Sequence, residues 1–484
     1  MDEVNIATVN AKPTKDFFMS MLTRDIEIKD AILDLLDNCL DGVARTQSKK
    51  GICRSSEEFY NGFYANIIIG ADSFEISDNC GGIPRNKALK EAFRMGRDDS
   101  FDKEACATVG IYGIGMKRAI FKMGRRATIQ SNTEDGAFIV EIPETWESDR
   151  ENWGFPIRDI VSVSDKNEYG TQITVGALVS AINDDWKDDD RRDVFLKSLI
   201  AYIKQSYSYI ISRGFVVTVN DIRVEQLSNF LLFSKEKGDI QPYIYQNEID
   251  GVSISCMVGF YSNPPSLEES DELASGQGAH RSSDESGCTI ICNDRVILYN
   301  NKDHLTGWGE NSVPRFHPQF IGILGMIVFE SNDASKLPMT TTKRGIDLAS
   351  PVYSMARKRL CEGLKLFTNF TNEWKGRAAQ LPYFSSERVQ PVDYRSILEG
   401  KGIVEELSFS KTQDQGVGMQ YKPVLPKPEK NMGSTNIRYS MPNDEFNIVK
   451  DFLLDELGVE FLSPGQVGEE TFKIVRGSIH REAE

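Results

Sequence analysis

The stretch Gly110-Ile111-Tyr112-Gly113-Ile114-Gly115-Met116-Lys117 places three glycines within six residues and ends on a lysine. Glycines at this density let backbone N–H groups approach an anion closely. The residues that follow, 118–121, are typical of the start of a helix, whose N-terminus carries a partial positive charge. The stretch therefore predicts a phosphate-binding turn, although glycine-rich turns also occur where nothing binds.

An amphipathic helix is predicted upstream, from Thr23 to Ala44, because apolar residues recur there at helical spacing. Its other face carries Asp34, Asn38 and Asp41, which line up in one row at i, i+4 and i+7. A carboxylate one turn from a carboxamide can orient a water molecule and hold a hydrated cation. The alternative is a solvated acidic face, but an Asn inside a helix lowers helix propensity, which favours a function.

Two short strands, 66–70 and 73–77, are predicted to lead into a turn that contains Asp78, Gly82 and Ile83. A carboxylate at the end of a strand can accept a hydrogen bond from an exocyclic amine, and a glycine turn lets the backbone lie flat against a ring. A plain Asp-Asn-Gly turn is the alternative. Alternation predicts three further strands, at 127–130, 137–140 and 169–175.

These motifs stand in a fixed order: Asp34-x-x-x-Asn38, then Asp78-x-x-x-Gly82-Ile83, then the glycine stretch, then Gly-Thr opening a strand at 170–171. This order resembles the motif set of the GHKL ATPases, the family of DNA gyrase, MutL, the ninety-kilodalton heat-shock chaperones and the sensor histidine kinases. The glycine stretch is most similar to that of the MORC ATPases and their bacterial relatives. The resemblance implies an α+β chain that begins with a Bergerat α/β sandwich, with ATP between its helical layer and a lid.

The resemblance also implies a role for each matching residue, with ATP and Mg²⁺ as the cofactors. Asn38 would bind Mg²⁺ and the phosphates, Asp78 would accept from the adenine amine, and Asp34 would stand where catalytic members carry their general base. The other cofactor-binding residues would be Gly82 and Ile83 near the base, Gly110, Gly113, Gly115, Met116 and Lys117 around the phosphates, and Thr171 through water.

Two positions depart from the family pattern. Asp34 stands where the catalytic members usually carry glutamate, and its side chain is one methylene shorter. A general base contributes roughly 10²–10⁴-fold to a rate, so an imperfect reach would leave slow turnover with binding intact. Cys80 replaces the first glycine of the adenine motif, where a positive φ would cost more for a residue with a side chain.

The residues after the predicted ATP site alternate between helical and strand-like patterns, and the resemblance implies that they form a transducer domain. In gyrase-like and MutL-like proteins a loop lysine of that domain reaches the γ-phosphate. Lys343, which follows three threonines in the stretch 337–345, matches this role, with a basic loop of no special function as the alternative. Such a contact is lost on hydrolysis and would couple nucleotide state to domain angle.

Five segments are predicted along the chain. They are a GHKL ATP-binding domain over 1–180, a transducer-like α+β domain over 181–348, a long helix over 349–380, a linker or extended arm over 381–445, and a small helical C-terminal module over 446–484.

Composition limits the classes of function that fit. A net charge of −16 repels nucleic acid on average, so contact with DNA would need a local basic patch. The four histidines lack metal-ligand spacing, which disfavours a zinc hydrolase. The first residues lack the basic and apolar stretches of a secretion leader, and no apolar run reaches membrane-spanning length. The eight cysteines are scattered and show no repeated Cys-x-x-Cys motif. We expect a cytoplasmic protein without membrane contact.

The main hypothesis is an ATP-binding, Mg²⁺-dependent ATPase that forms a homodimer on binding ATP and acts as a clamp or switch. By analogy with bacterial relatives, its setting would be DNA transactions or phage defence, with DNA or a protein as partner. A non-hydrolysing, nucleotide-gated interaction protein is the alternative that Asp34 suggests. A chaperone-like client binder would need a long charged linker, and a histidine kinase would need a phosphoacceptor histidine before the ATP site.

Overall fold

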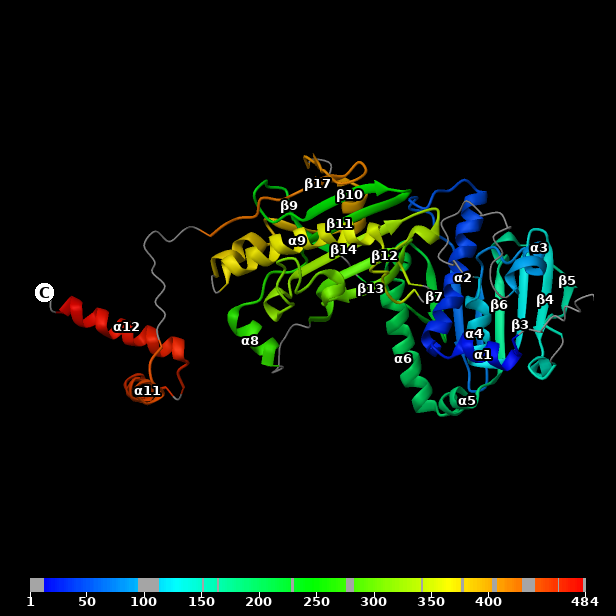
Figure 1. The fold of residues 1–484 in the computed structure, drawn as a ribbon, viewed down its shortest axis with the longest axis horizontal. Helices are drawn as coiled ribbons and strands as arrows, with labels where there is room; N and C mark the ends of the chain where they lie inside the picture. Colours follow the sequence, from blue (N-terminus) through cyan, green and yellow to red (C-terminus); the bar gives the residue numbers. More distant parts are fainter. Residues whose placement is uncertain are drawn as a thin grey trace, which may run out of the picture. The chain divides into compact units, whose positions relative to one another are not determined.

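A computed structural model describes residues 13–94, 113–149, 152–162, 165–227, 230–275, 283–340, 343–375, 378–402, 407–428, 440–459 and 461–481. The chain divides into two units, Met1–Pro428 and Glu429–Glu484. Within the first unit, the described residues form two parts, each built on one large sheet with helices packed against it (Figure 1). We call the part that holds strands β1 to β8 the first lobe and the part that holds strands β10 to β14 the second lobe. The α+β fold class predicted from the sequence is confirmed.

The first lobe is built on a sheet whose described strands have the order β5-β4-β3-β6-β2-β1-β7-β8. Neighbours are antiparallel except for β1 and β7, which run parallel. The strands are β1 (Tyr64–Ile69), β2 (Phe74–Asp78), β3 (Gly124–Thr133), β4 (Gly136–Ile142), β5 (Ile157–Ile160), β6 (Thr171–Leu178), β7 (Val216–Val219) and β8 (Ile222–Arg223).

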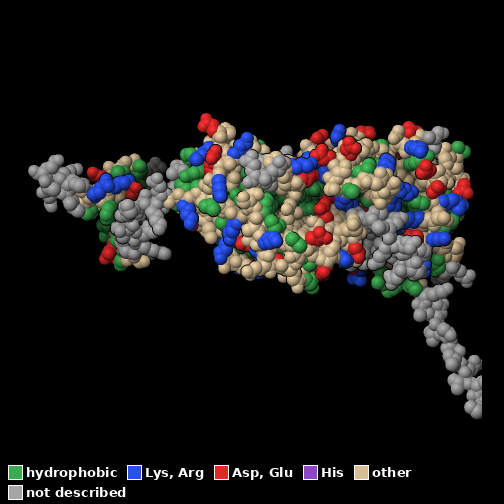
Figure 2. All heavy atoms as spheres, turned by 90° about the horizontal axis from the view of Figure 1, so that it is seen from above, with side chains coloured by type: hydrophobic (Ala, Val, Ile, Leu, Met, Phe, Trp, Pro, Cys, Tyr) green, Lys and Arg blue, Asp and Glu red, His purple; other side chains and the backbone are tan. Residues whose placement is uncertain are grey.

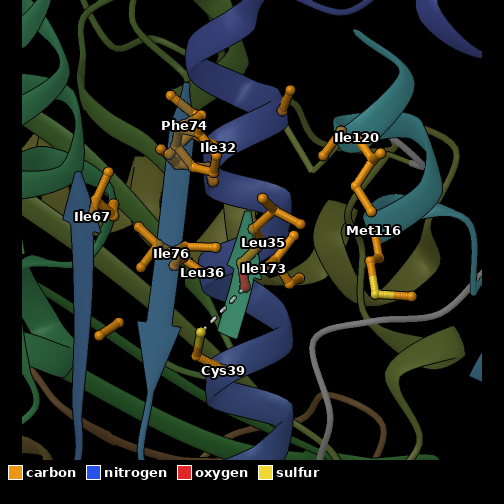
Figure 3. Packing of buried hydrophobic residues seen from close by; sticks show 14 of the residues in the cluster. Ile32, Leu35, Leu36, Cys39, Ile67, Phe74, Ile76, Met116, Ile120 and Ile173 are labelled. Atoms are coloured by element: carbon orange, nitrogen blue, oxygen red, sulfur yellow. Dashed lines mark hydrogen bonds between the residues drawn. The ribbon is translucent and has the colours of Figure 1, made fainter. Parts of the chain in front are cut away.

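Helices α1 (Lys15–Thr23), α2 (Ile28–Lys49) and α4 (Gly115–Met123) belong to the same lobe. Figure 3 shows Ile32 and Leu36 of α2 beside Phe74 and Ile76 of β2, with α4 on the other side of the helix. Each such side chain stabilises the fold by roughly 1.5–3 kcal/mol when fully buried. The helix is therefore packed between the sheet and α4, and this fixes its position relative to the end of β2.

The core of the first lobe continues beyond residue 180, where the sequence suggested that the domain ends. Helices α5 (Ser180–Lys187), α6 (Asp189–Ser206) and α7 (Ser208–Ser212) connect β6 to β7. Because β7 pairs in parallel with β1, a crossover connection is required, and these helices supply it. Their apolar residues share one core with α2.

In the second lobe, the described strands form a sheet of order β13-β12-β14-β11-β10-β17-β16, against which α9 (Pro351–Trp374) packs. The helix begins at an N-cap serine, Ser350, followed by a proline at the first helical position. The strands are β10 (Tyr243–Ile249), β11 (Val252–Phe260), β12 (Gly287–Cys292), β13 (Arg295–Asn301), β14 (Ile323–Glu330), β16 (Ser410–Lys411) and β17 (Met419–Tyr421).

The sequence predicted a linker or extended arm over 381–445, but the first part of this range forms strands that pair with the second lobe. Strand β15 (Val389–Asp393) pairs with β9 (Phe230–Ser234), and β17 pairs with β10, so the chain returns to the second lobe. These strands are short, contain polar residues, and in one case include a proline. Because the same features are typical of a linker, the sequence did not distinguish the two.

The second unit is described by itself. It holds helices α11 (Asn443–Leu457) and α12 (Pro464–Arg481), which share a small core of Leu453, Leu462 and Val467. None of the helices that the structure describes is long and apolar enough to cross a membrane.

The turn between β12 and β13 joins the two lobes of the first unit. Its residues Asn293 and Asp294 have positive φ values of 45° and 68°, as a two-residue hairpin turn requires. Asp294 is completely buried and contacts three groups of the first lobe: Arg54 at 2.8 Å, the hydroxyl of Tyr60 at 2.6 Å, and Arg213 at 3.1 Å. A turn of one lobe is thus fixed inside the other by a buried carboxylate.

We expect Asp294→Asn to lower the free energy of unfolding by about 3–5 kcal/mol, because two buried arginines would lose their counter-charge. Urea unfolding followed by circular dichroism measures this loss. The matched control is Asp159→Asn, which removes an ion pair with Arg85 in which both side chains are largely exposed. Such a pair contributes little, so equal losses in the two variants would contradict the assignment of Asp294 as the buried joint.

Candidate functional site

Helix α2 exposes a single side chain over most of its length. From Asp30 to Ala44 every described residue is buried except Asn38, which is exposed. The row of Asp34, Asn38 and Asp41 is therefore not the solvated acidic face that was one interpretation of the sequence. Asp34 and Asp41 lie inside the protein, and the carboxamide between them is open to a ligand.

Asp78, at the end of β2, is held by three groups. Its Oδ1 accepts a hydrogen bond from the backbone N–H of Cys80 at 2.7 Å, and its Oδ2 accepts one from the Cys39 thiol at 3.5 Å. The backbone N–H of Thr171 also donates to this carboxylate. Burial raises the pKa of Asp78, although these donors oppose the shift. The structure thus brings Thr171 to Asp78.

The turn after Asp78 places its strained residues at glycines. Gly81 and Gly82 have φ values of 96° and 67°, whereas Cys80 is not among the described residues with positive φ. The expected backbone cost at Cys80 is therefore absent, and its side chain is buried. Ile83 is tied to β3, because its N–H donates to the hydroxyl of Ser131 at 2.7 Å, which in turn donates to the Ile83 carbonyl at 3.1 Å.

Gly170 is needed because two backbone segments meet without room for a side chain. A Cβ at this position would lie 1.7 Å from the carbonyl oxygen of Asp78. The N–H of Asn132 donates to the Gly170 carbonyl at 2.9 Å, and the Gly170 N–H donates to the Asn132 carbonyl at 3.0 Å. Gly170 therefore sets the position of the Asp78 peptide.

The glycine stretch is described from Gly113 onward, and Gly110 lies outside the described residues. Gly113 has a φ of 65°, and α4 begins at Gly115 with no side chain capping its first N–H groups. Met116 is buried in the core. An ideal Cβ on Gly115 would lie 3.5 Å from the Cβ and Cγ of Asp34, so the first turn of α4 rests directly on that aspartate.

Lys117 is buried and donates to the backbone carbonyls of Ala92 and Arg94, each at 2.8 Å, and to that of Gly113. Burial lowers the pKa of its ammonium group to about 8. An ammonium has three N–H donors, and three carbonyls accept from this one. In this conformation all three donors of Lys117 are therefore occupied by backbone carbonyls.

Asp34 contacts two cations. Nε of Arg118 lies 3.1 Å from its Oδ2, Nη2 of Arg118 donates to the same oxygen, and Nζ of Lys343 lies 4.0 Å from Oδ1. Burial raises the pKa of Asp34, and Lys343 and Arg118 oppose that shift. A raised pKa makes a carboxylate a better proton acceptor near neutral pH.

Asp37, which the motif analysis did not single out, is the main partner of Lys343. The two form an ion pair at 2.7 Å, and Arg295 of β13 lies 3.2 Å from the other carboxylate oxygen, which also accepts from the hydroxyl of Tyr207 at 2.7 Å. Burial opposes ionisation of Asp37, but Lys343 and Arg295 outweigh it and lower the pKa of this carboxyl. In the sequence, Asp37 could have been found only by its place beside Asn38. Lys343 was indicated by its place in a loop rich in threonine.

The donors present fit Mg²⁺ only in part. Among the residues that the structure describes, no group of three or more His, Cys, Asp or Glu side chains could hold a metal ion. The exposed carboxamide oxygen of Asn38 is one hard donor, and Mg²⁺ commonly takes one or two protein oxygens and fills the rest of its shell with waters and phosphate oxygens. The site therefore fits the ion as a companion of phosphates.

Residues 26–153 match the family model described as "Histidine kinase-, DNA gyrase B-, and HSP90-like ATPase". The chain carries a GHKL-type ATPase domain. The match includes Asn38, Asp78 and the glycine stretch and ends before Thr171. GHKL domains bind ATP, typically with Mg²⁺. A search of curated proteins found no match to the chain.

Gly170→Ala is expected to weaken ATP binding to the GHKL domain at least about tenfold, since the new Cβ would displace the Asp78 peptide. Isothermal titration with a non-hydrolysable ATP analogue measures the affinity, and a thermal melt shows whether the variant remains folded. Gly468→Ala is the control because nothing lies within 4 Å of the added Cβ. Wild-type affinity in a folded Gly170→Ala protein would contradict the role of this contact.

Proposed function

We propose that this chain is a Mg²⁺-dependent ATPase that binds ATP against the exposed face of Asn38 and dimerises on binding it, as a clamp or switch. The observation that carries the proposal is the isolation of Asn38. It is the one exposed position between Asp30 and Ala44, on a helix that lies within the segment that matches the GHKL-type family model. An open carboxamide in such surroundings is the group that a ligand would meet.

The adenine would lie near the end of β2. Asp78 would accept a hydrogen bond from the exocyclic amine of adenine, and the positive φ values of Gly81 and Gly82 let the backbone approach the ring. Thr171 stands beside Asp78 and would complete this recognition through water. The hydrogen bonds that Asp78 already accepts hold its carboxylate in one orientation, which favours selective binding.

The phosphates would lie between Asn38 and the first turn of α4. The N–H groups of that turn have no side-chain cap, and a helix N-terminus favours an anion. Asn38 would hold Mg²⁺, which would neutralise charge on the phosphates. Gly113 and Gly115 would let the backbone come close, as Gly110 would from outside the described residues.

Hydrolysis would use Asp34 as the general base. A water molecule attacks the γ-phosphorus, the bond from phosphorus to the β–γ bridging oxygen breaks, and the proton of the water passes to the Asp34 carboxylate. Lys343 would balance the charge on the γ-phosphate. Its position beside Asp34 and Asp37 supports this role, because it brings a cation of the second lobe to the helix that carries Asn38.

A transducer role of the second lobe, in the manner of the MORC and MutL branch, follows from this contact. Closure of the two lobes around ATP would depend on a lysine that senses the γ-phosphate. The partner would be DNA or a protein, in DNA transactions or phage defence. On the face shown in Figure 2, basic and acidic side chains are interspersed, and with a net charge of −16 this favours a protein partner.

The alternative function is a nucleotide-gated interaction protein that does not hydrolyse ATP. The observation that favours it is the ion pair between Asp34 and Arg118, which occupies the carboxylate that would serve as base. The length of the Asp34 side chain also favours this alternative, since aspartate extends less far toward a water molecule than glutamate would.

We expect Asn38→Ala to lower the affinity for an ATP analogue about tenfold or more in the presence of Mg²⁺, and to remove most of the gain that Mg²⁺ brings. Titration of the metal at fixed nucleotide measures both effects. Asn447→Ala is the matched control, because it removes another exposed carboxamide from a helix, in the second unit. Normal affinity and metal dependence in Asn38→Ala would overturn the proposed site.

A non-hydrolysable ATP analogue is expected to convert the wild-type protein from monomer to dimer, and ADP is expected not to. Light scattering coupled to size-exclusion chromatography measures the mass in each state. No change in mass with the analogue would overturn the clamp. A dimer that hydrolyses ATP no faster than the Asp34→Ala variant would favour the non-hydrolysing switch.

A further inference from the structure

Two consecutive cations, Lys117 and Arg118, open helix α4, and they lie in different surroundings. Lys117 is about 1 % exposed, and its ammonium is shared among three backbone carbonyls. Moving it to a phosphate would break all three bonds. Lys117 therefore serves to join the start of α4 to residues 92 and 94.

Arg118 instead turns toward Asp34, one helical turn before Asn38. Its Nε and Nη2 both donate to the same oxygen, Oδ2, while Oδ1 faces Lys343. A guanidinium presents its N–H groups as a fork that matches two oxygens of a carboxylate or phosphate. Asp34 offers this fork only one oxygen, whereas a terminal phosphate would offer it two.

The charges around Asp34 also bear on an incoming anion. Arg118, Lys343 and Arg295 supply three positive charges, and Asp34, Asp37 and Asp41 supply three negative ones. The first N–H groups of α4 add partial positive charge, and their turn rests on Asp34. Residues four apart on a helix lie about 5–6 Å apart at their Cβ atoms, so a phosphate at Asn38 would be within reach of the Arg118 guanidinium.

We propose that Arg118, rather than Lys117, is the side chain of the glycine motif that binds the γ-phosphate, and that it leaves Asp34 to do so. This inference rests on the proposed function. Without nucleotide, Arg118 occupies the carboxylate of Asp34. With ATP bound, the same guanidinium moves to the γ-phosphate and frees that carboxylate to take the proton of the attacking water. ADP lacks the γ-phosphate, so Arg118 returns to Asp34 after hydrolysis and phosphate release.

This exchange makes the base available only when its substrate is in place. Water attacks the γ-phosphorus, the bond to the β–γ bridging oxygen breaks to release ADP, and the proton goes to Asp34. Arg118 and Lys343 then stabilise charge on the γ-phosphate oxygens from two directions. The loss of its guanidinium partner further favours proton uptake by the buried carboxylate.

The test compares the affinities of AMP-PNP and ADP by isothermal titration, with Mg²⁺ present. For Arg118→Gln, AMP-PNP affinity is expected to fall about tenfold or more while ADP affinity changes less than about twofold, since a hydrogen bond to a charged group is lost only with the γ-phosphate. Lys122→Gln is the control, because it also removes a cation from α4. The Lys122 ammonium donates to the carbonyl of Thr23 and not to Asp34. Both affinities are expected to remain at wild-type values in that variant.

Lys117→Met is expected to lower the melting temperature but to leave the ratio of AMP-PNP to ADP affinity unchanged. If Arg118→Gln does not fold, the double variant Asp34→Asn, Arg118→Gln removes both charges of the pair and carries the same measurement. Three results would each overturn the inference. They are an equal fall of AMP-PNP and ADP affinity in the Arg118 variant, unchanged AMP-PNP affinity in a folded Arg118 variant, and a selective fall of AMP-PNP affinity in Lys117→Met. A wild-type protein that binds neither nucleotide would instead overturn the proposed function.

Discussion

The structure depends on three of the four aspartates that are buried along helix α2. Asp30, Asp34 and Asp37 lie inside the protein, where an unpaired carboxylate would cost several kcal/mol (on the order of 3–5). Each is balanced by a cation from a distant part of the chain. Arg344 pairs with Asp30, Arg118 with Asp34, and Lys343 and Arg295 with Asp37; Tyr202 and Tyr207 donate to the first and the third.

Because these cations come from both lobes, the helix is the element at which the lobes are joined. Arg295, Lys343 and Arg344 belong to the second lobe, and Arg118 belongs to the helix that follows the glycine stretch. Buried ion pairs add little net stability compared with apolar packing, but breaking one partner is costly. This asymmetry makes such pairs weak sources of net stability but sensitive to a competing anion, which would keep the cation paired and leave the carboxylate without its partner.

Much of the first lobe could be predicted from the sequence, because its signals are local. The helical period of 23–44 and the alternation in β1, β2 and β6 predicted the layer and the sheet, and Asn38 was singled out by its poor helix propensity. The boundary at 180 was not where the core ends, because the parallel pairing of β7 with β1 depends on a partner about 150 residues away, which alternation does not reveal.

The candidate site was predictable in its residue types and less so in its contacts. Asp78 and Thr171, two residues to which the family resemblance gives a role, meet in the structure. The direction of the Lys117 side chain could not be foreseen, because it is set by the carbonyls of Ala92 and Arg94, more than twenty residues earlier in the chain. Asp37 was hidden for a related reason, since its partners Lys343 and Arg295 come from loops and strands of the other lobe.

The place of these cations beside Asn38, and not their exposure alone, decides which contacts a nucleotide there would reach. Asp294 at the hairpin joint is fully buried, and its partners Arg54 and Arg213 are 13 % and 7 % exposed. Lys343 and Arg118 are 14 % and 15 % exposed, and both lie against Asp34, one turn from the open carboxamide of Asn38. A nucleotide that enters at Asn38 would therefore compete for the cations around α2 while leaving the hairpin joint intact. The two kinds of buried charge thus separate a permanent connection between the lobes from one that a phosphate could replace.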